Sequence, residues 1–241
     1  MTVEQWPSPN HGDRTTGPID ILLLHYTGMP DSEQALRWLA NPASQVSCHY
    51  FVFEDGRTLQ LVDEARRAWH AGKSAWAGEP DVNSRSVGIE VANAGHPGGL
   101  PDFPDAQMEA VAVLCREILE RHPIPAHRVL AHSDVAPGRK IDPGERFPWF
   151  RLAAAGVGHW IEPTPISGGR FLCTGDTGGP VAALQAMLSL YGYEIEVSGD
   201  FDIRTRDVIA AFQRHFRQGR VDGVADASTV ETLRRLLSAI D

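Results

Sequence analysis

Four consecutive apolar residues, Ile21-Leu22-Leu23-Leu24, place the strongest constraint on how this chain folds. A continuous apolar run of this length is typical of a β-strand that is buried on both faces. The run ends at His25. A second apolar run, Val129-Leu130-Ala131, also indicates a strand and is followed directly by His132. The sequence therefore predicts two buried strands, each of which delivers a histidine to its end.

The segment that begins at His132 carries two more chemically active residues, Lys140 and Asp142. Two Pro-Gly pairs predict a tight loop over residues 131–144. Imidazole nitrogens and carboxylate oxygens are ordinary zinc ligands, and a catalytic zinc keeps three protein ligands and a water. His25, His132 and Asp142 are therefore candidate zinc ligands. In the alternative interpretation, the histidines are strand-end or loop residues and Asp142 forms a turn.

An acidic residue interrupts the alternating segment Ser86–Asn93. Val87, Ile89 and Val91 face one side of this predicted strand, while Glu90 faces the other. A half-buried carboxylate costs free energy unless it is paired or functional. Glu90 is therefore a candidate general base in a cleft, and the alternative is a solvent-facing residue on an exposed sheet face.

Lys140 is one of only two lysines among the 22 basic residues, and Lys73 is the other. A lysine in this loop, in a chain that otherwise uses arginine, suggests a chemical role. His70 follows a predicted hairpin over residues 48–62 with Asp-Gly at its turn. It lies in a loop that extends to Arg85, so it is either a substrate contact or a solvated histidine.

Composition narrows the class of protein. The chain has 241 residues and a formal net charge of −9, which argues against nucleic acid and anionic membranes as partners. No apolar run approaches the ~20 residues that a membrane span needs. The start of the sequence lacks the basic and apolar regions of a signal peptide, so we expect a cytoplasmic protein, or a periplasmic one if a leader is missing.

Residues 162–169 have the composition of a linker, and we place the domain boundary there. Residues 170–241 beyond it predict three helices. The first begins after Gly178-Gly179, the second near Ile203, and the third at a capping box of Ser228 and Glu231. These helices carry no acid–base set. We expect them to bury a core of their own and to tether the protein to its substrate.

Residues 1–161 resemble the zinc-dependent N-acetylmuramoyl-L-alanine amidases of the amidase 2 type, which are related to peptidoglycan-recognition proteins. The matching segments are Leu24–Thr27, Val46–Tyr50, Ala68–Gly72, Ser86–Glu90 and the loop 131–144. Residues 170–241 resemble the three-helix peptidoglycan-binding module. The matches are Gly175, Gly178–Val181, Leu184-Gln185, Gly192-Tyr193, Gly199–Asp202, Thr205, Phe212-Gln213 and Asp222-Gly223.

The resemblance implies an α/β (α+β) fold, with a mixed central sheet and flanking helices followed by a small three-helix bundle. It implies zinc held by His25, His132 and Asp142, with Glu90 as catalytic acid–base and Lys140 matching the family's lysine two residues before the third ligand. Further candidates for contacts with sugar and peptide are Trp69, His70, Asn83, Arg85 and Asn93.

The activity implied is hydrolysis of the amide between N-acetylmuramic acid, or its 1,6-anhydro form, and L-alanine. The expected partners are peptidoglycan or muropeptides, and we expect a monomer. The absence of a leader favours the cytoplasmic recycling amidases, whereas the binding module favours intact wall. The alternative function is a non-catalytic recognition protein. We disfavour it because such a relative is expected to lose a zinc ligand, and this chain keeps all three together with Glu90.

Overall fold

Strand β3 (Ile21–Tyr26) lies between β7 (Ser86–Val91) and β8 (Val129–Ala131) in the central sheet of the computed structural model, which describes residues 2–240. The six strands have the order β1-β5-β4-β7-β3-β8, where β1 is Glu4–Gln5, β4 is Tyr50–Val52 and β5 is Thr58–Gln60. β3 runs parallel to both neighbours, and β4 is antiparallel to β5. The mixed sheet and the hairpin are as predicted.

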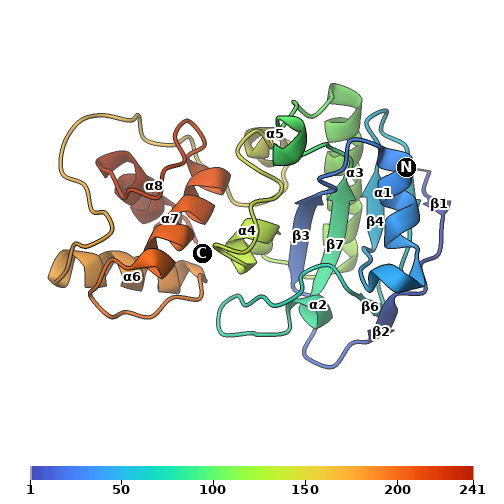
Figure 1. Ribbon diagram of the computed structural model, residues 1–241, viewed down its shortest axis with the longest axis horizontal. Helices are drawn as coiled ribbons and strands as arrows, with labels where there is room; N and C mark the ends of the chain where they lie inside the picture. The colour runs from blue at the N-terminus through green and yellow to red at the C-terminus, as the bar shows by residue number, and fades with distance from the viewer. Residues whose placement is uncertain (1, 241) are drawn as a thin grey trace.

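The two faces of β3 are covered by different parts of the chain (Figure 1). Residues 21–24 are all fully buried, as the continuous apolar run predicts. Leu22 and Leu24 pack toward α3 (Asp105–Arg121), whose apolar residues recur at helical spacing. Ile21 and Leu23 face the opposite side, which is the side that His25 also faces. This second side of the sheet therefore carries the candidate site.

Helix α1 (Ser32–Leu39) covers part of that second side, and Asp31 caps it by accepting a hydrogen bond from the Gln34 backbone at 2.9 Å. No helix within residues 2–240 has both the length and the apolar character to cross a bilayer. The remaining elements before the bundle are β2 (His11–Asp13), η1 (Pro42–Ser44), β6 (Arg66–Ala68), α2 (Val82–Arg85), η2 (His96–Gly98), η3 (Ala126–Arg128), α4 (His132–Val135) and α5 (Trp149–Ala154).

The C-terminal part forms the three predicted helices, α6 (Gly179–Tyr191), α7 (Ile203–Phe216) and α8 (Ala227–Leu237). One detail of the prediction is wrong. The N-cap of α8 is Asp226, whose carboxylate accepts the Thr229 backbone N–H at 2.8 Å, and not Ser228. The Ser228 hydroxyl instead donates to the carbonyl of Thr164 in the segment between the two parts of the chain. This cap thus begins the helix two residues earlier than predicted.

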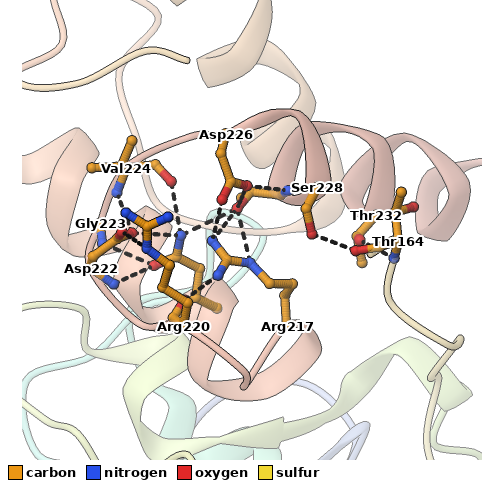
Figure 2. Close-up of polar contacts among 11 residues, drawn as sticks. Thr164, Arg217, Arg220, Asp222, Gly223, Val224, Asp226, Ser228 and Thr232 are labelled. Carbon is orange, nitrogen blue, oxygen red and sulfur yellow. Dashed lines mark hydrogen bonds and ion pairs between the residues drawn. The ribbon is translucent and has the colours of Figure 1, made fainter. Parts of the chain in front are cut away.

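A buried arginine ties the bundle together (Figure 2). Arg217, only 1% exposed, donates to Asp226 at 3.2 Å, to Thr229 at 2.7 Å and to the carbonyl of Arg220. These bonds join the end of α7 to the loop that enters α8. The Thr164 backbone donates to Thr232 of α8 at 3.1 Å. The segment 162–169 is therefore anchored to the bundle at Thr164.

The expectation that the bundle buries a separate core is wrong. A single continuous cluster of buried residues joins Ile21, Leu23 and Leu130 of the sheet to the inward faces of α6, α7 and α8. Trp76, which is 1% exposed, reaches from the first part of the chain and packs edge-on against Tyr193 at 4.9 Å. A Cβ on Gly192 would lie 2.5 Å from the Trp76 ring, so glycine is required there. The bundle therefore shares a hydrophobic core with one side of the sheet.

Candidate active site

Three adjacent parallel strands bring the candidate residues together at the carboxyl ends of the strands. His25 of β3 pairs in register with Glu90 of β7, so both side chains project from the same face. Leu24 pairs with Ala131 of β8, which puts His132 beside His25 at the beginning of α4. The carboxyl ends of parallel strands form the crevice in which ligands bind in open α/β sheets. Strand register thus assembles the site.

The three predicted metal ligands converge on one point. The two facing Nδ1 atoms of His25 and His132 lie 2.8 Å apart, and the Asp142 Oδ2 atom is 3.2 Å from the first and 2.9 Å from the second. All three residues are buried, with 1%, 3% and 6% of their surfaces exposed. The Ser133 backbone donates to the Asp142 carbonyl at 3.0 Å and so holds the two ends of the loop together.

The donor set fits zinc. Ligand atoms 2.0–2.1 Å from a tetrahedral zinc are roughly 3.3 Å from one another, so small outward shifts would accommodate the ion. Each imidazole also has its other nitrogen engaged. Nε2 of His132 faces the Ala71 carbonyl at 3.1 Å, and Nε2 of His25 faces Nδ1 of His70 at 3.1 Å. Protons on the two Nε2 atoms leave both Nδ1 lone pairs free for a metal.

His70 is not a solvated loop residue. It is 8% exposed and lies beneath His25, with its Nε2 atom 3.3 Å from the Ser86 hydroxyl. Ser86 in turn donates to the Val82 carbonyl at 2.6 Å, so its oxygen is left to accept a hydrogen bond from His70 Nε2. His70 Nδ1 then accepts from His25 Nε2. A Cβ on Gly88 would lie 2.5 Å from the His70 ring. Glycine at this mid-strand position therefore makes room for the histidine that supports His25.

The electrostatics of His25 and Asp142 favour metal-binding protonation states. Burial, with a smaller contribution from His132, lowers the pKa of His25 to about 4. This low pKa keeps the His25 imidazole neutral. Burial alone would raise the pKa of Asp142, but the charge and hydrogen bonds of His132, with those of His25, hold it well below its usual range. Neutral imidazole and ionised carboxylate are the forms that bind a cation.

Glu90 has a different environment. Its residue surface is partly exposed, but the Oε2 atom is buried and has no hydrogen-bond partner among the described residues. Burial raises the pKa of Glu90 well above its ordinary value, and the negative charge of Asp142 raises it further. An unpaired carboxylate with a raised pKa, at the edge of a cleft, suits a group that exchanges protons near neutral pH.

A cleft of about 290 Å³ contains these groups. Lys140 and Trp69, both predicted, lie in its wall. His70, Glu90, His132 and Asp142 also line it. Sequence reasoning missed its remaining lining residues, which are Tyr26, Thr27, Trp38, Leu39, Val46 and Ser47. Trp38 is half exposed on α1, and an exposed tryptophan on a surface helix was the available signal.

Three of the predicted substrate contacts lie away from this cleft. The Asn83 carboxamide accepts the backbone N–H groups of His70 and Ala71 at 3.0 and 2.8 Å. Arg85 forms ion pairs with Asp20 and Glu79 beside the opposite end of β7. Asn93 donates to the Pro101 carbonyl at 2.9 Å and accepts from the Gly95 backbone at 2.8 Å. These side chains shape loops and anchor strand ends in the structure.

Comparison with known families agrees with this site. Residues 15–145 match the family model of N-acetylmuramoyl-L-alanine amidase. The chain belongs to this amidase family. Residues 177–233 of the amidase match a putative peptidoglycan binding domain. The enzyme hydrolyses the amide bond between N-acetylmuramic acid and L-alanine in peptidoglycan or muropeptides, so the non-catalytic alternative is not supported.

The amidase is similar over most of its length to characterised proteins. It is 38% identical to N-acetylmuramoyl-L-alanine amidase AmiD of Escherichia coli over 235 residues, which cover 91% of this chain and 82% of AmiD. The AmiD complex with anhydro-N-acetylmuramic acid-L-Ala-D-γ-Glu-L-Lys superposes with a TM-score of 0.78 at 37% identity, covering 92% of this chain and 91% of that one. AMPDH3 of Pseudomonas aeruginosa in complex with anhydromuramic pentapeptide gives 0.73 at 29% identity, with 98% and 94% covered.

Proposed function

We propose that this amidase is zinc-dependent and that it cleaves muropeptides, including those that end in 1,6-anhydro-N-acetylmuramic acid. The observation that carries the proposal is the convergence of His25, His132 and Asp142, whose ligand atoms lie within 4.8 Å of one another. The relatives AmiD and AMPDH3 hold anhydromuramic peptides in their solved complexes, which supports the substrate class. The monomeric state and the cytoplasmic location stay predictions.

In this proposal, His25 and His132 bind the metal through Nδ1 and Asp142 binds it through Oδ2. Two neutral imidazoles and one carboxylate would leave a bound divalent ion with a net charge of about +1. Zinc bound there supplies a Lewis acid and lowers the pKa of a coordinated water to roughly 7. His70 and the Ala71 carbonyl orient the two imidazoles from behind.

Glu90 moves the proton in this mechanism. Its carboxylate accepts a proton from the attacking water and later delivers it to the nitrogen of L-alanine, so that the C–N bond breaks to release a neutral amine. The buried, unpaired Oε2 atom of Glu90 suits this task, because no internal hydrogen bond must be broken before the proton is accepted. The raised pKa of Glu90 brings its proton affinity closer to that of the groups it serves.

Lys140 stabilises negative charge on the carbonyl oxygen as the tetrahedral intermediate forms. Lys140 lies in the wall of the cleft, which Glu90 and Asp142 also line. A compact ammonium acts as a point charge, and placing it where charge develops lowers the barrier without binding the ground state equally well. Trp69, which also lines the cleft, is the proposed platform for sugar or peptide.

The experiment combines metal analysis with a defined anhydromuropeptide. We expect one zinc per chain in the wild type and release of anhydro-N-acetylmuramic acid and free peptide, identified by mass spectrometry. His132→Ala should lose zinc and activity together. Glu90→Gln should keep zinc but lose kcat by ~10²–10⁴, the usual contribution of a general base. Full zinc in His132→Ala, or wild-type turnover in Glu90→Gln, would contradict these roles.

A further inference from the structure

A fully buried carboxylate lies at the junction between the bundle and the metal-site loop. Asp134, two residues after His132 in α4, has no exposed surface. A buried carboxylate is energetically costly unless hydrogen bonds compensate it. Asp134 has three donors. Tyr193 donates to Oδ1 at 2.7 Å, while His215 Nδ1 and the Ala131 backbone lie 2.7 and 2.8 Å from Oδ2.

The two side-chain donors come from the bundle and are themselves held in place. The His215 ring stacks between Trp149 and Phe216, with ring centroids 3.7 and 3.8 Å away. Tyr193 packs edge-on against Trp76. Burial raises the pKa of Tyr193 well above its ordinary value, as does the charge of Asp134, so the phenol keeps its proton and acts as a donor. Both rings are 2% exposed.

Asp134 also controls the short helix that carries His132. Through Oδ2 it accepts the backbone N–H of Ala131, the last residue of β8, and so fixes the turn from strand to helix. The intervening residue, Ser133, donates its backbone N–H to the carbonyl of Asp142. The Asp134 carboxylate therefore fixes the backbone that carries His132. The Ser133 peptide links this backbone to Asp142.

We propose that Tyr193 and His215 are positioning residues, through which the C-terminal bundle holds Asp134 and thereby orients the metal ligand His132. The inference rests on the zinc site proposed above. It gives the bundle a second task besides binding cell wall, because the bundle completes the support of the metal site. Outer hydrogen bonds that orient a metal ligand contribute roughly 10–100-fold to metal binding, and Asp134 acts on His132 through the backbone of Ala131.

Tyr193→Phe tests the proposal with a minimal change, because it keeps the ring against Trp76 and removes one hydrogen bond to Asp134. We expect zinc affinity, measured by competition with a chromophoric chelator, to fall by roughly 10-fold. On a soluble anhydromuropeptide at saturating zinc, we expect kcat to fall several-fold with KM little changed. His215→Phe, which keeps a stacked ring but removes Nδ1–H, should act in the same direction.

Tyr191→Phe is the matched control. Tyr191 is also 2% exposed at the same junction, but its hydroxyl lies 3.0 Å from His159 Nδ1, and among the described residues it forms no hydrogen bond with Asp134. It should change the melting temperature as much as Tyr193→Phe does, yet leave zinc affinity and kcat unchanged. The proposal would be overturned if Tyr191→Phe lowered zinc affinity as much as Tyr193→Phe does. It would also be overturned if neither Tyr193→Phe nor His215→Phe lowered zinc affinity. A wild type without zinc would instead refute the proposed metal site.

Discussion

Each metal-facing imidazole in this amidase has its second nitrogen held by a neighbour, and the two neighbours differ. His132 uses a backbone carbonyl, which no substitution at Ala71 removes. His25 uses the side chain of His70, which is open to mutation. Burial lowers the pKa of His70 well below its ordinary value, with further lowering from His25 and His49. His70 is thus a neutral imidazole whose Nδ1 accepts.

His70→Ala should therefore weaken metal binding without destroying the fold. The substitution leaves Nε2 of His25 without its acceptor and opens space above Gly88, so we expect zinc affinity to fall by roughly 10–100-fold. Chelator competition measures it. His127→Ala is the control, because His127 lies in η3 before β8, at the strand end away from the site. Unchanged zinc affinity in His70→Ala would show that His25 needs no support.

Lys140→Met should retain zinc and bind substrate with little change, but lose kcat by ~10²–10³, which is typical of one lost oxyanion donor. Lys140→Arg should recover only part of this, since a planar guanidinium cannot occupy the same point. Steady-state kinetics on a defined muropeptide measure both. Lys73→Met removes the chain's other lysine, which is exposed outside the cleft, and should leave kcat intact. Unchanged kcat in Lys140→Met would remove Lys140 from the mechanism.

At the scale of elements, Glu64 joins the sheet to the helix behind it. Its carboxylate accepts hydrogen bonds from Tyr50 of β4 at 2.6 Å and from Arg121, the last residue of α3, at 2.7 Å. His122 Nε2 lies 2.6 Å away. Burial would raise the pKa of Glu64, but these hydrogen bonds outweigh it and lower the pKa to about 2. Since the unperturbed value is 4.5, the folded state favours the ionised form.

The stabilisation by Glu64 should therefore be present above pH 4.5 and be lost as the pH falls toward 2. Allowing for screening of the exposed Arg121, we expect Glu64→Gln to cost about 1–2 kcal/mol of unfolding free energy at pH 7. The difference from wild type should shrink at pH 3, as measured by urea denaturation. Glu33→Gln, which breaks an exposed pair with Arg57, should change little at either pH. A pH-independent effect of Glu64→Gln would contradict the ionic origin.

At the scale of the whole molecule, one shared core predicts one unfolding transition. Trp76 is buried and packs against Tyr191 and Tyr193 of the bundle, so Trp76→Ala should cost ~3–5 kcal/mol, as is usual for a large buried aromatic residue. Calorimetry should show a single transition in the wild type and a lower melting temperature in the variant. Trp6→Ala, at a residue that is 43% exposed, is the control. Two separate transitions in the wild type would contradict the shared core.

The sequence by itself determined the elements whose signals are local. Ile21–Leu24 form a buried strand because every residue is apolar. Asp31 caps α1 because its carboxylate accepts a hydrogen bond from the backbone N–H three residues later, which is sufficient to begin a helix. The family motifs also located His25, Glu90 and His132, which follow or interrupt a recognisable strand, and Asp142, which lies in the loop motif after His132. Local competition explains the wrong N-cap of α8, where Asp226 and Ser228 both suit a helix start.

Only the tertiary structure decided how these elements meet. The placement of His70 beneath His25 depends on contact between a loop and a glycine of a distant strand, which no spacing in the sequence encodes. Asn83 lies in α2 and Asn93 in the loop after β7, and their amides satisfy backbone groups. The shared core of sheet and bundle arises because Trp76 and Asp134 find their partners more than 50 residues away. These pairs are determined by long-range packing and buried hydrogen bonds, which local sequence patterns do not encode.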